Sequence, residues 1–334
     1  MKFEIALGYN SKLDKLETLK AINIIKNNLK QKIMERNLLI EINPALVTNK
    51  ELWLNDDFQG TQRALDFDLV NNNFYGEILQ SNNKYRRHFL MKNGLQNVGD
   101  GVISDFSCLR RDEKIGNTTS NIYDEIGFEI VVNKYETDYL NDFIVALYGQ
   151  LISVDEMVKD EFDQLEKEHL STQITFISFS KLKALYPFIS FKERLNRFAK
   201  ENGSFVLTNF VKKLFNTKDL NNFSEDVFDF NSYSIIYTYN PVTESAVEIA
   251  YLSYSVDREI LQEQNLLLKE NFKTKTGYDH LVTTGKLPLT ISGGVYTSKF
   301  TMLVLEKNHI AEVQNSIWSK DFEDFCDKNE INIL

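Results

Sequence analysis

The stretch Leu38-Leu39-Ile40-Glu41-Ile42-Asn43-Pro44 is a short apolar run that ends at a proline. Because proline cannot donate a ladder hydrogen bond, the run predicts a strand that stops there. Directly before it, over residues 14–37, apolar side chains recur every three or four positions, which predicts one face of a long helix. These side chains belong to Leu16, Leu19, Ile22, Ile25, Leu29 and Ile33. A long helix that leads into a proline-ended strand is therefore the first predicted pair of elements.

Outward from this pair, strands and helices follow one another without a regular βαβ alternation. Residues 101–109 and 123–133 predict two extended segments that form a hairpin around a long charged loop. Further strands are expected over residues 173–179, 205–207, 233–239 and 246–255, and further helices over residues 138–170, 191–202 and 258–270. This order favours an α+β fold with a mostly antiparallel central sheet flanked by helices. No internal repeat or low-complexity linker interrupts the chain, so we expect a single domain over residues 1–334.

The composition argues against several classes of protein. The 38 basic and 48 acidic residues give a formal net charge of −10, which disfavours a general binder of nucleic acid or of anionic membranes. The two cysteines, Cys108 and Cys326, provide neither a disulfide framework nor a metal-ligand spacing. No stretch approaches the roughly 18 apolar residues of a membrane span, and the first residues lack the apolar core of a signal peptide. We therefore expect a cytoplasmic protein without nucleic-acid or membrane partners.

The chemistry that the sequence offers rests on arginines, lysines and carboxylates. The four histidines have no metal-pair spacing, and no Gly-x-Ser-x-Gly, phosphate-loop or dinucleotide motif is present. At the tip of the predicted hairpin, Arg110 and Arg111 precede Asp112 and Glu113. Guanidinium groups bind phosphate oxygens in a bidentate way, so this tip is a candidate phosphate site. A solvated hairpin turn is the alternative.

Two further places are candidate anion sites. The basic run over residues 84–88, taken as a strand, would direct Lys84 and Arg86 to one face, and the alternative is a solvated charge run. Ser292-Gly293-Gly294 predicts a turn before an apolar helix, whose first backbone N–H groups attract anions. A plain tight turn is the alternative there.

Glu244 and Glu248 are the acidic candidates. Their even spacing places both side chains on one face of the strand that is predicted there. Oxygen ligands of this type suit Mg²⁺ that bridges nucleotide phosphates. The alternative is a solvated strand face.

Taken in order, these pieces resemble the catalytic domain of class II aminoacyl-tRNA synthetases, and more narrowly the asparagine synthetase A family of aspartate–ammonia ligases. The resemblance spans nearly the whole chain, because several separate motifs stand in the family's order and spacing. The matching stretches are residues 35–41 with Pro44, Asn55-Asp56-Asp57-Phe58-Gln59-Gly60, Leu109-Arg110-Arg111-Asp112-Glu113, Tyr239-Asn240-Pro241-Val242, Thr290-Ile291-Ser292-Gly293-Gly294, Thr301-Met302-Leu303 and residues 309–318. The resemblance implies the class II synthetase fold.

The resemblance also implies a reaction. In this family, ATP with Mg²⁺ activates the side-chain carboxylate of aspartate to β-aspartyl-AMP, and ammonia then displaces AMP. The resemblance assigns Arg110 to the α-phosphate of ATP, Glu113 to the adenylate end and Glu248 to the metal. The third-motif residues that it places near ATP are Lys299, Gly293 and Gly294.

The resemblance places four residues on the substrate side. These residues are Asp56, Ser81, Lys84 and Arg86, and Arg86 replaces a lysine that is usual there. Asp56 and Lys84 are expected to be catalytic together with Arg110. Because the first-motif helix and strand usually form the subunit interface in such families, a homodimer is expected.

The chain departs from the family pattern at several positions around the expected pocket. The family has a glutamine, an aspartate, two serines, an arginine, a metal-side acid and a third-motif arginine at these positions. The residues that this chain has instead are, in the same order, Glu125, Gly127, Ala250, Tyr251, Ser255, Ile235 and Lys299. The family's acidic Pro-Asp-Tyr-Asp-Asp-Trp segment is not recognisable between Leu214 and Phe230.

Three functions stay open at this point. The first is a working aspartate–ammonia ligase with a diverged pocket. The second is a catalytically inactive homologue (a pseudoenzyme) that serves as a structural or assembly component, with a protein partner. The third is a ligase that forms the adenylate of a different carboxylic acid.

Overall fold

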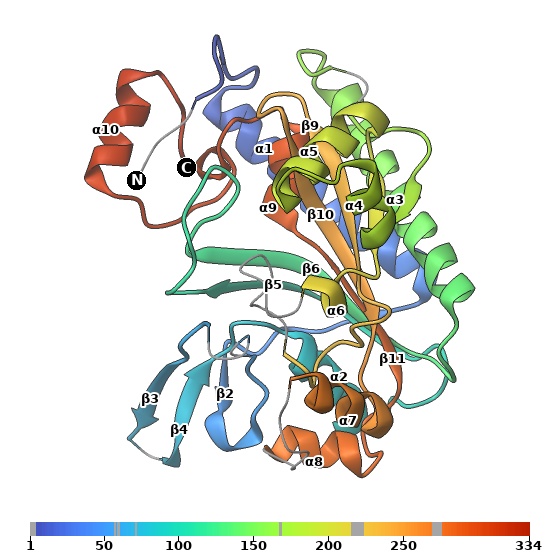
Figure 1. The fold of residues 1–334 in the computed structure, drawn as a ribbon. Coiled ribbons are helices and arrows are strands. Elements are labelled where there is room, and N and C mark those ends of the chain that lie inside the picture. The colour runs from blue at the N-terminus through green and yellow to red at the C-terminus, as the bar shows by residue number, and fades with distance from the viewer. Residues whose placement is uncertain are drawn as a thin grey trace.

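An eight-stranded sheet forms the centre of the computed structural model, which describes residues 5–56, 58, 61–70, 72–166, 169–214, 224–268 and 276–334. Across the sheet the strands are β1 (Ile40–Glu41), β5 (Gly101–Leu109), β6 (Ile122–Val131), β11 (Thr290–Val295), β10 (Ser245–Tyr254), β9 (Ser234–Asn240), β8 (Phe205–Thr208) and β7 (Thr175–Ser178) (Figure 1). Neighbours from β5 to β8 pair antiparallel, and the outer pairs β1–β5 and β7–β8 are parallel. The prediction of an α+β fold with a mostly antiparallel sheet is confirmed.

Helices pack against the eight-stranded sheet. The long helices α1 (Lys15–Asn37) and α3 (Thr137–Glu161) contact each other and lie with α9 (Thr297–Val304) over one sheet face (Figure 1). None of the described helices is long and apolar enough to cross a bilayer. The other elements are β2 (Val47–Asn49), the 3₁₀ turn η1 (Lys50–Leu52), β3 (Leu65–Leu69), β4 (Asn72–Ile78), α2 (Asn83–Lys92), α4 (Phe179–Leu185), α5 (Phe191–Asn202), α6 (Val211–Leu214), α7 (Arg258–Leu267), α8 (Gly277–Thr283), η2 (Ile310–Glu312) and α10 (Lys320–Lys328).

Alternate residues of the central strands face two different environments. On β6, Ile126, Phe128 and Ile130 belong to the main apolar core, which the strands form with α1 and α3. The alternate positions Glu125, Gly127 and Glu129 are on the opposite face, because successive residues of a strand face opposite sides. That face carries buried polar groups and the candidate site.

The first predicted pair of elements is confirmed. At the start of α1, the Asp14 carboxylate accepts a hydrogen bond from the Glu17 N–H at 2.7 Å, and the Glu17 carboxylate accepts one from the Asp14 N–H at 2.9 Å. The helix ends at Leu38, in the left-handed region with φ of 52°, and β1 follows. The buried stripe differs from the predicted one at its start, where Leu16 and Leu19 are 62% and 42% exposed. The buried residues of α1 are Thr18, Ala21, Ile25, Leu29 and Ile33.

The basic run at residues 84–88 is helical, so its prediction as a strand is wrong. It lies in α2, which contains lysine, arginine, leucine and methionine, all good helix formers, and no β-branched residue. The helix directs Lys84 and Arg86 to different partners, Asp226 and Glu125, rather than to one shared face. Both side chains are buried, which also excludes a solvated charge run.

The predicted turn at Ser292-Gly293-Gly294 is also wrong. These residues lie inside β11 and pair with β6 on one side and β10 on the other. A Cβ atom at Gly293 would stand 2.5 Å from the Phe128 ring, and one at Gly294 would stand 2.9 Å from the Tyr251 ring. The two glycines therefore allow aromatic side chains of the neighbouring strands to cross β11.

A buried carboxylate connects the end of α9 to the beginning of the chain. Glu306 follows α9 with φ of 54°; its carboxylate forms an ion pair with Lys12 and accepts a hydrogen bond from the Glu166 N–H at 2.6 Å. The Nε2 atom of His169 lies 3.1 Å from the same carboxylate. Burial acts to raise the pKa of Glu306, but His169 and Lys12 outweigh burial and lower the pKa to about 2.

We expect Glu306→Gln to lower the free energy of unfolding by about 1–3 kcal/mol at neutral pH. The folded pKa of about 2 lies below the ordinary value of 4.5, so this contribution is complete above about pH 5 and is lost as the pH falls towards 2. Urea unfolding at neutral pH and near pH 3 measures the difference between wild type and variant, which should shrink at the lower pH. Glu323→Gln on the surface of α10 is the control. An equal difference at both pH values would contradict the expectation.

Candidate active site

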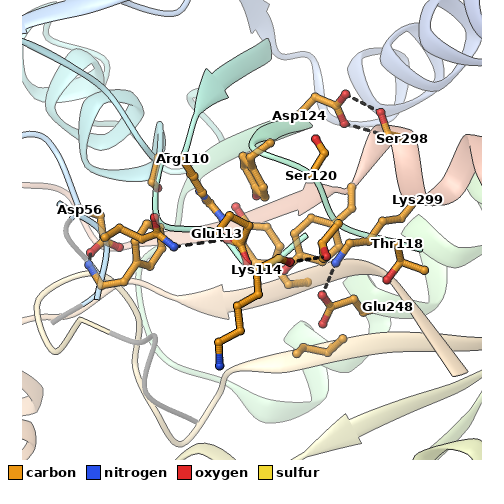
Figure 2. Close-up of a pocket in the computed structure, with 18 of the residues that line it drawn as sticks. Asp56, Arg110, Glu113, Lys114, Thr118, Ser120, Asp124, Glu248, Ser298 and Lys299 are labelled. Carbon is orange, nitrogen blue, oxygen red and sulfur yellow. Dashed lines mark hydrogen bonds and ion pairs between the residues drawn. The ribbon is translucent and has the colours of Figure 1, made fainter. Parts of the chain in front are cut away.

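A cavity of about 520 Å³ lies on the polar side of the sheet. Its walls come from the β5–β6 loop, from β6, β9 and β10, and from the start of α9 (Figure 2). Lys84, Arg86, Gly293 and Gly294 are not among its lining residues. The predicted site residues that do line it are Asp56, Ser81, Arg110, Glu113, Glu248 and Lys299.

Arg110 presents a positive charge to the cavity. Its guanidinium carbon lies 3.6 Å from the centre of the Tyr123 ring and 4.6 Å from that of Phe58, and its Nε donates to the Gln80 carbonyl at 3.0 Å. Within the described part of the chain, no carboxylate forms an ion pair with this guanidinium. Glu113 lines the same side of the cavity. An uncompensated guanidinium with a fixed position suits a phosphate oxygen.

At one end of the cavity, Asp56 lies next to the buried ion pair of Lys84 and Asp226. Its carboxylate accepts hydrogen bonds from the Phe58 N–H at 2.9 Å and from the Ser224 hydroxyl. Behind it, the Lys84 ammonium lies 2.6 Å from the Asp226 carboxylate. The neighbouring motif residues 57, 59 and 60 are outside the described residues.

Burial and neighbouring charges shift the pKa values of Asp56 and Lys84. Burial raises the pKa of Asp56, and the charge of Lys84 opposes that shift. Burial also acts to lower the pKa of Lys84, but the Asp226 and Asp56 carboxylates outweigh it and raise that pKa, so the ammonium stays charged. Lys84 does not line the cavity, so its charge acts there through Asp56, which does.

The sequence analysis did not predict Asp226 as a site residue. It lies in the segment where the family's acidic motif was sought, and residues 215–223 of that segment are outside the described residues.

The predicted metal residue, Glu248, forms an ion pair with Lys299, whose ammonium lies 4.9 Å from the centre of the Tyr296 ring. Glu244 does not share a strand face with Glu248, because it lies in the turn before β10 with φ of 48° and is exposed. Among the described residues, no three His, Cys, Asp or Glu side chains gather as metal ligands. The described residues thus form no ready-made cage of protein ligands for a magnesium ion, and we assign no step to one.

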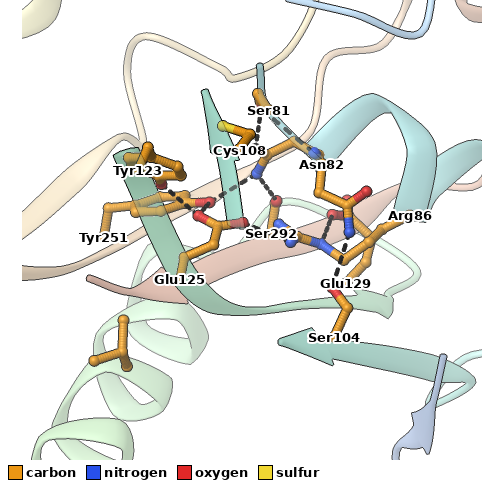
Figure 3. A network of polar contacts seen from close by, with 12 residues as sticks. Ser81, Asn82, Arg86, Ser104, Cys108, Tyr123, Glu125, Glu129, Tyr251 and Ser292 are labelled. Carbon is orange, nitrogen blue, oxygen red and sulfur yellow. Dashed lines mark hydrogen bonds and ion pairs between the residues drawn. The ribbon is translucent and has the colours of Figure 1, made fainter. Parts of the chain in front are cut away.

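Arg86 is fully buried under the cavity, not in contact with it as a substrate residue would be. Its side chain is 0% exposed, and Nη1 lies 2.7 Å from the Glu125 carboxylate (Figure 3). A Cβ atom at Gly127 would stand 2.2 Å from this Nη1 atom. Two of the departures from the family pattern, at residues 86 and 127, thus complement each other, because the missing side chain leaves room for the guanidinium.

Tyrosines close the floor of the cavity above this ion pair. The second Glu125 oxygen accepts hydrogen bonds from Tyr123 at 2.5 Å and Tyr251 at 2.9 Å (Figure 3). The Tyr251 ring stacks on Tyr233 with 5.9 Å between centroids and contacts Tyr296 at 5.5 Å. The Asn83 amide donates to the Tyr251 oxygen at 2.8 Å. Both Glu125 oxygens are thus engaged by protein groups.

The N-terminus of α9 already binds a carboxylate of this chain, that of Asp124. The Asp124 carboxylate accepts hydrogen bonds from the Ser298 N–H at 2.9 Å, from its hydroxyl at 2.5 Å and from the Gln314 amide at 2.8 Å (Figure 2). Asp124 therefore takes the place that the predicted glycine turn and helix offered to a phosphate. Sequence reasoning missed this contact, because its members lie far apart in the chain.

We expect Gly127→Ala to lower the free energy of unfolding by about 1–3 kcal/mol, because the added methyl group would overlap the buried Arg86 guanidinium. Gly149→Ala is the matched control: Gly149 is exposed on α3, and nothing lies within 4 Å of the point that a Cβ atom would occupy there. That change should raise stability by up to about 1 kcal/mol. Urea unfolding of both variants measures the difference, and a neutral Gly127→Ala would show that Arg86 moves freely.

Comparisons with known proteins agree with this fold. A family model described as aspartate-ammonia ligase matches residues 16–330. Aspartate–ammonia ligases of Bacillus thuringiensis (strain Al Hakam) and Bacillus cereus (strain 03BB102) are each 29% identical over 328 residues, which cover 98% of this chain and all of theirs.

Solved structures show the same architecture. Asparaginyl-tRNA synthetase from Pyrococcus horikoshii, complexed with asparaginyl-adenylate, has a TM-score of 0.66 at 12% identity over 90% of this chain and 68% of its own. The enzyme from Entamoeba histolytica, also with asparaginyl-adenylate, has a TM-score of 0.64 at 12% identity, over 90% and 66%. This chain thus spans about two thirds of their length. The predicted class II synthetase fold is confirmed, and the chain belongs to the aspartate–ammonia ligase family.

Proposed function

We propose that this chain is an ATP-dependent aspartate–ammonia ligase, which activates the side-chain carboxylate of aspartate as its adenylate and transfers it to ammonia. The proposal rests on family membership and on one observation above all. An open cavity of about 520 Å³ keeps Arg110 without a carboxylate partner among the described residues and places Asp56 at one end. Relatives at 29% identity are named for this activity.

The proposed reaction has two steps. A carboxylate oxygen of aspartate attacks the α-phosphorus of ATP, which is supplied as its magnesium complex, and the bond to pyrophosphate breaks. Arg110 neutralises the charge that grows on the α-phosphate oxygens. Ammonia then attacks the acyl carbon, the bond to AMP breaks, and the nitrogen gives up a proton, for which we assign the Asp56 carboxylate as acceptor. Lys299 leaves Glu248 to face the phosphates in this scheme.

Exchange of labelled pyrophosphate into ATP, with and without aspartate, tests the proposal. We expect exchange that depends on aspartate, followed by AMP and asparagine when ammonia is added. Absence of exchange with aspartate would overturn the proposal. Exchange with another carboxylic acid would keep the adenylation step and replace aspartate as the substrate.

A second candidate is a non-catalytic homologue, which two contacts favour. The Glu248–Lys299 ion pair neutralises two charged side chains that line the cavity, and Arg86 is buried in a pair with Glu125 instead of reaching the cavity. For this candidate we expect neither exchange nor measurable binding of ATP by calorimetry. Tight ATP binding would speak against it.

We also propose that the chain forms one domain and assembles as a homodimer through α1 and β1. The apolar Leu38 and Ile40, at the junction of the two elements, are 86% and 51% exposed in the single chain. The eight-stranded sheet takes its strands from residue 40 to residue 295, which supports one domain.

Light scattering at micromolar concentration should give twice the mass of one chain. Ile40→Lys should reduce it to one chain, because a charge at the interface would be desolvated. Phe188→Lys, at a residue 98% exposed between α4 and α5, should leave the mass unchanged. A monomeric wild type would exclude the dimer.

A further inference from the structure

We propose that Arg86 is a positioning residue that acts on the phosphate-binding Arg110 through Glu125 and Tyr123. The inference rests on the proposed function only in assigning a phosphate to Arg110. The contacts run from Arg86 on α2, under the cavity, to Glu125 and Tyr123 on β6 (Figure 3), and from Tyr123 to Arg110 in the β5–β6 loop. Each contact fixes the next side chain along this path.

The first contact fixes Glu125. Arg86 Nη1 donates to one Glu125 oxygen at 2.7 Å, and both side chains are at most 1% exposed. The guanidinium fills the space beside Gly127, where a Cβ atom would stand 2.2 Å from Nη1. A buried ion pair contributes little net stability, and here Nε and Nη2 of Arg86 lack a hydrogen-bond partner among the described residues. A contribution to stability therefore does not by itself explain why an arginine is buried at position 86.

The second contact fixes Tyr123. Its hydroxyl donates to the other Glu125 oxygen at 2.5 Å. Tyr251 donates to the same oxygen at 2.9 Å, so both Glu125 oxygens are engaged and the carboxylate cannot rotate without losing a bond. The ring plane of Tyr123 is thereby held across the floor of the cavity.

The third contact fixes Arg110. Its guanidinium lies 3.6 Å from the centre of the Tyr123 ring, well within the range of a cation–π interaction. A phenol that donates its proton to a carboxylate has a more electron-rich ring, which attracts the cation more strongly. The Gln80 carbonyl accepts a hydrogen bond from Nε, and among the described residues no carboxylate forms an ion pair with the terminal nitrogens.

Two substitutions test whether Arg86 positions Arg110 through these contacts or only stabilises the fold. Tyr123→Phe keeps the ring and removes the hydroxyl, and Arg86→Lys keeps the charge with a shorter reach. We expect both to weaken AMP binding about 5- to 30-fold, because the ring at position 123 is no longer anchored to Glu125 and its cation–π contact with Arg110 weakens. Both should also move the Nε–H signal of Arg110 in the NMR spectrum of protein with ¹⁵N-labelled arginine, assigned by its loss in Arg110→Lys.

Tyr254→Phe is the matched control, since its buried hydroxyl donates to the Glu136 carbonyl at 2.8 Å and Tyr254 does not line the cavity. It should leave AMP affinity and the Arg110 signal unchanged. The proposal is overturned if Tyr123→Phe leaves the Arg110 signal in place, or if Tyr254→Phe moves it equally. If Arg86→Lys fails to fold, Tyr123→Phe alone decides. If the wild type binds no AMP, the proposed function fails, and the NMR signal still decides this inference.

Discussion

Arg110→Ala should lower the rate of aspartate-dependent pyrophosphate exchange by about 100- to 1,000-fold, the usual effect of losing one preorganised group that stabilises transition-state charge. Within the described residues this guanidinium has no ion pair, while two rings and a carbonyl fix it at the cavity. Its charge is therefore available to the substrate without first breaking an internal contact. Exchange assays with purified variants measure the effect.

The neighbouring Arg111 provides the matched control. Its side chain is 39% exposed, contacts Asp112 only at 3.9 Å and does not line the cavity. Arg111→Ala removes the same charge from the same loop, so it should leave the exchange rate within about twofold. Equal losses in both variants would mean that the loop's overall charge matters, not the placement of Arg110.

Arg86→Met should lower the free energy of unfolding by about 3–5 kcal/mol, because it leaves the Glu125 carboxylate buried without its cation. Urea unfolding near neutral pH measures the change. The double variant Arg86→Met with Glu125→Gln should recover part of the loss, since it removes both buried charges. No recovery would show that the destabilisation comes from lost packing.

An exposed ion pair gives the control for that experiment. Lys26 and Asp105 lie 2.9 Å apart with side chains 30% and 35% exposed. Lys26→Met should cost at most about 1 kcal/mol, because solvent screens such pairs. A cost for Arg86→Met that is no larger would contradict the buried-pair argument.

The parts of the fold that the sequence predicted correctly are local. The helix and proline-ended strand, and the hairpin of β5 and β6, depend on periodicity and on one proline, both readable over a few residues. Arg110 and Glu113 were found for the same reason, because they share one hairpin loop. The residues 84–88 were misjudged, because alternation was assumed where the absence of β-branched residues indicated a helix.

The contacts that the sequence did not predict join partners that are far apart in the chain. Lys84 meets Asp226, Arg86 meets Glu125 and Lys299 meets Glu248 only after the sheet has formed. No periodicity links such positions, so the sequence shows each charge without its neutralising partner. The prediction of a turn at Gly293 and Gly294 was wrong for a similar reason. These positions lack side chains because aromatic rings of the adjacent strands occupy the space.

The close fit of Arg86 against Gly127 restricts the order in which this sequence can change. Any residue with a Cβ at position 127 would collide with the guanidinium while Arg86 is present. A mutational route back towards an acidic residue at position 127 must therefore first shorten the side chain at position 86. We therefore expect relatives that carry a side chain at position 127 to carry a shorter one at position 86.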